Sequence, residues 1–292
     1  RPKVPLPSTR RTTHGPTRKP AKSCKAENLC ESMQQLKTFK EDGFVAVPQF
    51  CNSVELSSIE SALANFIDFR ISQLPPEEVF YEDKAKPESL KQIQRMHDHD
   101  EFFSAFFNEK PKALAAELLG EPVVGKNLQY FNKPPGIGQA TPPHQDGHYF
   151  MLQPCHAVTM WMALDPVDQE NGCVRYLRGS HHDGLRPHAR TQTLGFSQGI
   201  VDYGKNETRE EVPCPAQPGD LLVHHALTVH RADANLSRTR SRRARHGGRC
   251  KPFARSCDRP AAPAVRAASS PRCRFRGRRP RPSGAARARS RR

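Results

Sequence analysis

The stretch PPHQDGHY, residues 142–149, decides how the rest of this sequence is interpreted. His144 and Asp146 lie two residues apart within it, so at the end of a strand their side chains point to the same face. An imidazole nitrogen and a carboxylate oxygen on one face can bind the same metal ion. An ordinary surface pair of histidine and aspartate has the same spacing, so the motif needs support from elsewhere in the chain.

That support comes from His230, which follows the turn 218–220 and the apolar run Leu221–Val223. Two histidines and one carboxylate on one side of a metal leave three coordination positions open, as in non-haem iron(II) oxygenases. A bidentate 2-oxo acid can occupy two of these positions and dioxygen the third. We therefore predict that His144, Asp146 and His230 bind iron(II).

A basic cluster follows His230 within thirteen residues. It contains Arg238, Arg240, Arg242 and Arg243. An arginine on the strand beside the distal histidine can bind the far carboxylate of 2-oxoglutarate through two parallel hydrogen bonds. The cluster is thus a candidate for the co-substrate contact.

The sequence around these residues predicts helices first and a β-domain afterwards. Asn52 or Ser53 can cap a helix whose apolar positions 56–67 follow a 3.6-residue period, and a second helix is expected over Pro111–Leu119. Short apolar runs between turn signals then predict a β-barrel or sandwich. These runs are Val123–Val124, Leu128–Phe131, Val158–Leu164, Cys173–Leu177 and Leu221–Val223.

The net charge of +16 describes the two ends of the chain and not its centre. Residues 238–292 contain 20 basic residues and one acidic residue, and residues 1–32 contain 8 and 2. Residues 33–237 therefore hold 18 basic and 27 acidic residues, a net charge of −9. We predict disordered basic segments at 1–32 and 245–292 around a folded domain at 33–244, because the ends have too few apolar residues to offset chain entropy.

Other classes of protein receive little support. No apolar run approaches 18 residues, so no membrane span is expected, and no secretory signal is visible. The nine cysteines contain no CxxC pair, which argues against a zinc ribbon. The predicted location is the cytoplasm or an organelle interior, and any contact with nucleic acid is expected only through the basic tail.

The region from about Leu36 to Ala244 resembles the phytanoyl-CoA dioxygenase family. The matching pieces are FKEDGFVAVPQF (39–50), NKPPG (132–136), HQDGHYF (144–150), MWMALDPVDQENGCVRYLRGSH (160–181), PGDLLVHHALTVHRADAN (218–235) and SRRA (241–244). The resemblance implies a mainly β fold with flanking helices, the double-stranded β-helix or jelly roll. It also implies iron(II), 2-oxoglutarate and dioxygen as cofactor and co-substrates, and a small-molecule or acyl-CoA substrate.

The same resemblance assigns residues to the co-substrate. Arg242 best matches the carboxylate-binding arginine, with Arg240 and Arg243 as alternatives. Trp161 and Gln129 match positions that line the 2-oxoglutarate pocket, and Lys91 or Gln92 matches a further contact. Related halogenases lack the carboxylate that Asp146 supplies, so its presence favours hydroxylation.

Two alternatives to an active oxygenase stay open at this point. The family continues after the arginine with an apolar strand that closes the sheet, whereas residues 245–249, RHGGR, cannot alternate as a buried strand. A jelly roll without its last strand would leave an open sheet edge and impaired catalysis. The other alternative is a nucleic-acid-binding protein that acts through its basic tail.

Overall fold

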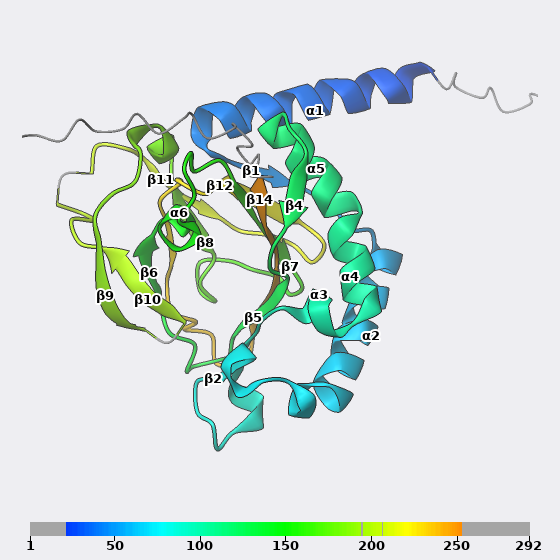
Figure 1. The fold of residues 1–292 in the computed structure, drawn as a ribbon, viewed down its shortest axis with the longest axis vertical. Helices are drawn as coiled ribbons and strands as arrows, with labels where there is room; N and C mark the ends of the chain where they lie inside the picture. The colour runs from blue at the N-terminus through cyan, green and yellow to red at the C-terminus, as the bar shows by residue number, and fades with distance from the viewer. Residues whose placement is uncertain (1–21, 194, 206, 253–292) are drawn as a thin grey trace, which may run out of the picture. The chain divides into compact units, whose positions relative to one another are not determined.

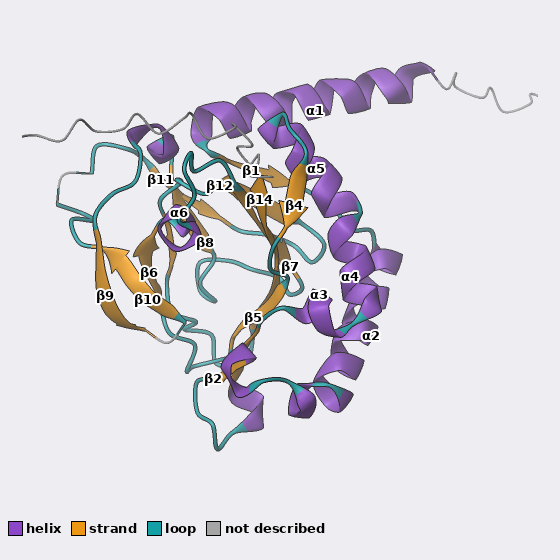
Figure 2. Cartoon of the chain, viewed as in Figure 1, coloured by secondary structure: helices purple, strands orange, loops and turns teal. Residues whose placement is uncertain are grey.

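In the computed structural model, two β-sheets lie face to face and helices cover the outer side of the larger one (Figures 1 and 2). The structure describes residues 22–193, 195–205 and 207–252. This is the jelly roll that the sequence predicts. No helix in these ranges is long and apolar enough to cross a membrane.

The larger sheet has the strand order β1-β12-β7-β14-β5-β3-β2, with β4 paired to β14. Its strands are β1 (Phe44–Val47), β2 (Val79–Tyr81), β3 (Leu90–Ile93), β4 (Val123–Gly125), β5 (Gln129–Lys133), β7 (Val158–Ala163), β12 (Leu221–His225) and β14 (Arg242–Pro252). The smaller sheet has the order β11-β8-β13-β6. Its strands are β6 (Thr141–His144), β8 (Val174–Leu177), β11 (Glu211–Cys214) and β13 (His230–Ala232).

A separate hairpin and the helices complete the described fold. The hairpin consists of β9 (His188–Thr193) and β10 (Phe196–Ile200). The α-helices are α1 (Lys22–Asp42), α2 (Ser53–Phe69), α3 (Met96–His99), α4 (Glu101–Asn108), α5 (Lys110–Leu119) and α6 (Asp146–Phe150). Short 3-10 helices are η1 (Ile71–Gln73), η2 (Pro76–Glu78), η3 (Pro87–Ser89) and η4 (Ser180–Asp183).

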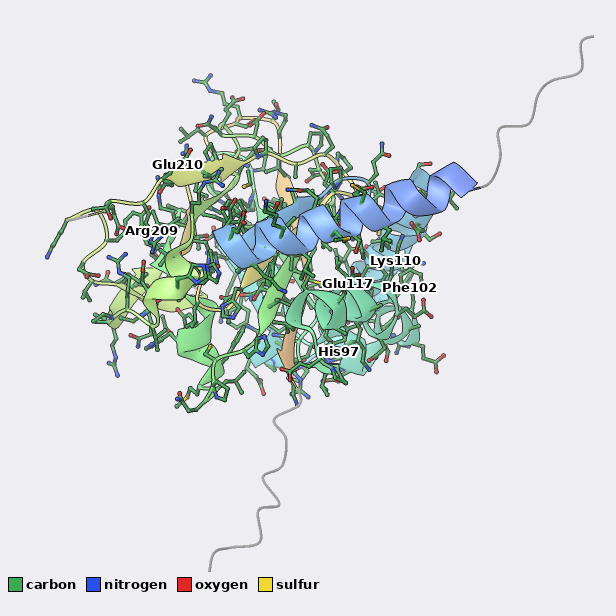
Figure 3. The ribbon with its side chains drawn as sticks, turned by 90° about the horizontal axis from the view of Figure 1, so that it is seen from above. His97, Phe102, Lys110, Glu117, Arg209 and Glu210 are labelled. Atoms are coloured by element: carbon green, nitrogen blue, oxygen red, sulfur yellow. The ribbon has the colours of Figure 1, made fainter. Side chains whose placement is uncertain are left out.

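Helices α2 and α5 form where their capping residues predict. The Asn52 side chain accepts hydrogen bonds from the backbone of Val54 and Glu55, and the Glu55 carboxylate accepts one from the Asn52 backbone. Helix α5 ends at Gly120, which adopts the left-handed conformation that glycine allows. Helix α1 lies across α5, where Ser32 donates a hydrogen bond to Glu117 (Figure 3).

Strand β7 shows how the two-residue period divides the core into two layers. Met160 and Met162 face the helices in the outer core. Trp161 and Ala163 face the space between the sheets, where they pack with residues of β8 such as Tyr176. The inner face is therefore the face on which side chains from both sheets meet.

The structure differs from the prediction at both ends of the domain. Disorder is predicted through residue 32, but helix α1 begins at Lys22. The C-terminal half of this helix packs on β1 and α5. At the other end, the sequence allowed a jelly roll without its closing strand. Strand β14 nevertheless occupies 242–252 and pairs with both β7 and β5. Hydrogen bonding on both sides forms this strand without apolar alternation, and the register shift falls between Gly247 and Cys250. The predicted tail beyond residue 252 lies outside the described residues.

Candidate metal centre

The three predicted ligands meet on the inner face of the smaller sheet. His144 ends β6, Asp146 begins α6, and His230 begins β13. Strands β6 and β13 are antiparallel and place His230 directly opposite His144, with 4.1 Å between their ring centroids. One ligand atom from each of the three buried residues lies within 4.8 Å of the others. Among the described residues, this is the one group of histidine, cysteine and acidic side chains with such spacing.

Both imidazole rings are oriented for metal binding. The Nδ1 of His144 lies 2.8 Å from the carbonyl oxygen of Pro142, and the Nδ1 of His230 lies 3.0 Å from that of Thr228. Each Nδ1–H therefore donates to a carbonyl, which leaves the Nε2 lone pairs facing Oδ1 of Asp146 at 3.5 Å and 4.0 Å. Neutral imidazoles beside one carboxylate oxygen are a donor set that suits iron(II).

The electrostatics keep Asp146 and His230 in their metal-binding forms. Burial, together with the neighbouring His144 and His224, holds the pKa of His230 well below its ordinary value. Burial alone would raise the pKa of Asp146, but its contacts with the neighbouring histidines, His144, His224 and His230, hold it well below its ordinary value. The site therefore combines a carboxylate with a neutral distal imidazole.

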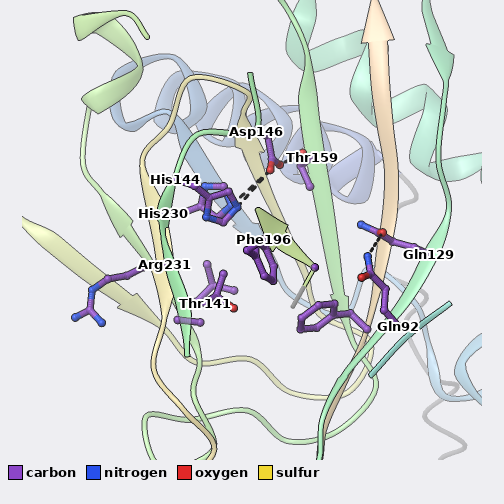
Figure 4. Close-up of a pocket in the computed structure, with 13 residues that line it drawn as sticks. Gln92, Gln129, Thr141, His144, Asp146, Thr159, Phe196, His230 and Arg231 are labelled. Carbon is purple, nitrogen blue, oxygen red and sulfur yellow. Dashed lines mark hydrogen bonds and ion pairs between the residues drawn. The ribbon is translucent and has the colours of Figure 1, made fainter. Parts of the chain in front are cut away.

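The second carboxylate oxygen of Asp146 is held by residues that the sequence analysis did not select. Thr159 of β7, which lies beside Asp146 in Figure 4, donates a hydrogen bond to Oδ2. The Nε2 of His224 lies 3.3 Å from the same oxygen. The Tyr176 hydroxyl lies 3.0 Å from Nδ1 of His224 and fixes that ring in turn. Strand alternation predicts that either His224 or His225 faces the interior, and the structure shows that it is His224.

A cavity opens beside the three ligands (Figure 4). Its lining comes from both sheets and from the β9–β10 hairpin. Apart from the ligands, the lining residues are Gln92, Gln129, Phe131, Thr141, Thr159, Val174, Gly195, Phe196, Arg231 and Ala232. The Phe196 ring lies 5.1 Å from the His144 ring and 5.8 Å from the Phe131 ring, so the hairpin forms an aromatic wall next to a metal ligand.

The predicted co-substrate residues divide between this cavity and other places. Gln129 lines the cavity and accepts a hydrogen bond of 2.7 Å from Gln92. Gln92 pairs in register with Phe131 and shares its inward face. Lys91 is not among the described residues that line the cavity, because it points to the other face of β3 and forms a buried ion pair of 3.0 Å with Glu82. Trp161 packs between the sheets, outside the described lining.

The candidate arginines are also separated. Arg240 forms ion pairs with Asp168 and Glu170, and Arg243 forms a bidentate pair with Asp165. Both guanidinium groups are thus already bound to carboxylates. Arg242 begins β14, where its register partner in β5 is Lys133.

Comparison with known proteins agrees with this geometry. A family model described as phytanoyl-CoA dioxygenase matches residues 39–244, which include all three metal ligands. The chain belongs to the phytanoyl-CoA dioxygenase family. It is 28% identical to the peroxisomal phytanoyl-CoA dioxygenase of Bos taurus, in a match that covers 72% of this chain and 66% of that protein. It is 34% identical to phytanoyl-CoA dioxygenase domain-containing protein 1 of Danio rerio, in a match that covers 52% of this chain and 54% of that protein.

The chain therefore spans less than two thirds of the length of both relatives. Among solved structures, the epimerase SnoN in complex with Fe3+, alpha ketoglutarate and nogalamycin RO has a similar fold. The TM-score is 0.59 at 22% identity, over 74% of this chain and 82% of SnoN. At that identity the likeness establishes the fold.

Proposed function

We propose that this phytanoyl-CoA dioxygenase family member is an iron(II)- and 2-oxoglutarate-dependent dioxygenase that hydroxylates a small-molecule or acyl-CoA-like substrate. The observation that carries the proposal is the convergence of His144 Nε2, His230 Nε2 and Asp146 Oδ1 beside a cavity. Iron(II) bound there would supply the reduction of dioxygen, coupled to oxidative decarboxylation of 2-oxoglutarate. The presence of Asp146 favours hydroxylation over halogenation.

The protein's share of the reaction is binding, orientation and exclusion of water. Thr159 and His224 hold Asp146 so that one oxygen faces the two histidines. Arg242 is the proposed partner of the far carboxylate of 2-oxoglutarate. The amides of Gln129 and Gln92 point into the cavity, as Figure 4 shows, and are proposed to contact the same co-substrate. Of the two alternatives Lys91 and Gln92, we propose Gln92 for this contact, and Trp161 packs behind the cavity between the sheets.

The remaining lining favours an uncharged, partly apolar substrate group next to the metal. Phe131, Phe196 and Val174 supply apolar surface. Arg231 also lines the cavity, but its Nε lies 2.7 Å from Glu211, and Figure 4 shows its guanidinium pointing away from the ligands. The charged parts of a substrate would therefore lie outside this part of the cavity.

Succinate formation by the full chain tests the proposal. Iron(II) and 2-oxoglutarate are added with and without a panel of small acids and acyl-CoA thioesters, and succinate and hydroxylated product are measured. We expect metal-dependent succinate formation that is lost in His144→Ala and Asp146→Ala, together with binding of one metal ion per chain that the same variants lose.

Two results would contradict the proposal. One is normal succinate formation in the Asp146→Ala variant. The other is metal binding without any succinate formation, which would instead favour the catalytically impaired relative. The described residues do not test the nucleic-acid alternative, because most of its predicted basic tail, from residue 253 onward, lies outside them.

A further inference from the structure

The backbone just before Arg242 is held by a buried asparagine that follows the metal ligand His230 by five residues. Asn235 is 2% exposed. Its Nδ2 donates to the carbonyl oxygen of Arg240 at 2.7 Å and to that of Lys133 at 2.8 Å. Its Oδ1 accepts from the backbone N–H of Ser237 at 3.0 Å. All three polar contacts of this side chain are therefore to backbone groups.

A second buried asparagine reaches the next residue of the same segment. Asn171 is fully buried, and its Nδ2 donates to the carbonyl oxygen of Pro166 at 2.8 Å and makes a longer contact of 3.4 Å with that of Ser241. Beyond Arg242, the backbone N–H of Arg243 donates to the Asp165 carboxylate at 2.7 Å. The carbonyls at 240 and 241 and the N–H at 243 are thus all held by side chains.

The position of Asn235 links the two halves of the site. Its backbone N–H donates to the carbonyl of Gly138 at 2.9 Å, on the segment that leads into β6 and His144. Asn235 therefore contacts the segment before His144, the end of β5 and the segment that leads into β14. The register partner of Arg242, Lys133, is one of the residues that it holds.

We propose that Asn235 and Asn171 are positioning residues that set the distance between the metal and Arg242, and so determine the affinity for the far carboxylate of 2-oxoglutarate. This inference rests on the proposed function. A bidentate arginine–carboxylate contact is sensitive to small displacements, and a shift of about 1 Å can cost about a hundredfold in rate. Neither asparagine touches the co-substrate in this arrangement, because their amides are used on the backbone.

A purely structural role would weaken every ligand alike, so the test compares two 2-oxo acids. Both 2-oxoglutarate and pyruvate can chelate the metal through the 2-oxo acid group, but pyruvate has no far carboxylate. Their dissociation constants are measured by calorimetry on the nickel(II)-loaded full chain. We expect Asn235→Asp to weaken 2-oxoglutarate binding about tenfold or more, while the affinities for nickel(II) and pyruvate stay within about twofold.

The matched control is Asn132→Asp. Asn132 is also a buried asparagine, in β5 beside β14, but its described side-chain contact is with the other neighbouring strand, because its Nδ2 donates to the carbonyl of Leu90 in β3 at 2.9 Å. It should leave the ratio of the two affinities unchanged. Asn171→Asp keeps the Oδ1 acceptor and loses only the Nδ2 donor, so it carries the test if Asn235→Asp does not fold.

A double-mutant cycle with Arg242→Ala completes the experiment. If Asn235 acts through Arg242, then Asn235→Asp has no further effect on 2-oxoglutarate affinity once the arginine is removed. Equal losses for both 2-oxo acids, or additive losses in the cycle, would overturn the inference and leave the proposed function intact. If the wild-type chain binds nickel(II) but holds 2-oxoglutarate no more tightly than pyruvate, the proposed function fails, and this inference with it.

Discussion

Replacing Thr159 by valine tests whether the residues behind Asp146 control metal affinity. Thr159 is 3% exposed, and its hydroxyl donates to Oδ2 of Asp146, which His224 also contacts at 3.3 Å. The substitution keeps the branched shape and removes one of the two described donors. A hydrogen bond to a charged group contributes about 1.5–3 kcal/mol, and each 1.4 kcal/mol is a factor of about ten. We therefore expect metal binding to weaken about 10- to 100-fold, the usual range for such partners.

The assay is competition against a coloured chelator for cobalt(II), without 2-oxoglutarate, so that only the metal site is measured. Thr141→Val is the matched control, because Thr141 is buried and lines the same cavity without a described contact to Asp146. We expect Thr141→Val to bind cobalt(II) like the wild type. The reasoning is refuted if Thr159→Val does so too while both variants unfold at the wild-type temperature.

Three further predictions follow from the same contacts. Gln92→Leu should raise the KM for 2-oxoglutarate severalfold, because Gln92 lines the cavity. Lys91→Met should lower the melting temperature, because it breaks the buried ion pair with Glu82, and should leave that KM unchanged. A raised KM in Lys91→Met would contradict the assignment. Phe196→Ala should let a chelator remove the metal severalfold faster, because its ring covers His144, and an unchanged removal rate would count against the hairpin as a wall. Burial and neighbouring histidines lower the pKa of His225 from 6.5 to about 4. Between these values the unfolded chain binds more protons than the folded chain. The stability of the fold should therefore fall as the pH drops from about 6.5 to about 4. In His225→Gln the urea midpoint should fall less between pH 7.5 and pH 5 than in the wild type, and an equal fall would exclude His225 as a cause.

The metal ligands could be predicted from sequence because their spacing reflects local geometry. The pair His144 and Asp146 falls at a strand end, and the run before His230 has the composition of a strand. The co-substrate wall could not be predicted in the same way. All four residues of β3, LKQI, are buried, so burial gives no sign of which ones face inward. A register difference of one residue exchanges Lys91 for Gln92, and only the pairing of Gln92 with Phe131 decides it.

Thr159 and His224, which hold Asp146, could not be predicted from the sequence for a related reason. All six residues of β7 are buried, so the threonine within it resembles any other core position. His224 lies 78 residues from Asp146, and no local pattern joins them. Strand β14 is the opposite case, since its residues look unsuited to a strand, yet hydrogen bonds from β5 and β7 on both sides define it. Local patterns thus predict the elements, and long-range pairing decides which faces meet.

The two halves of the proposed site depend on different sheets. The metal ligands meet through the pairing of β6 with β13 in the smaller sheet, while the position of Arg242 depends on the pairing of β14 with β5 in the larger one. A defect confined to β14 would therefore spare metal binding and weaken 2-oxoglutarate binding. An impaired relative and an active oxygenase then differ in a measurable way even before a substrate is known. Full cobalt(II) affinity with no preference for 2-oxoglutarate over pyruvate identifies the former, and tight binding of both metal and 2-oxoglutarate identifies a site ready for catalysis.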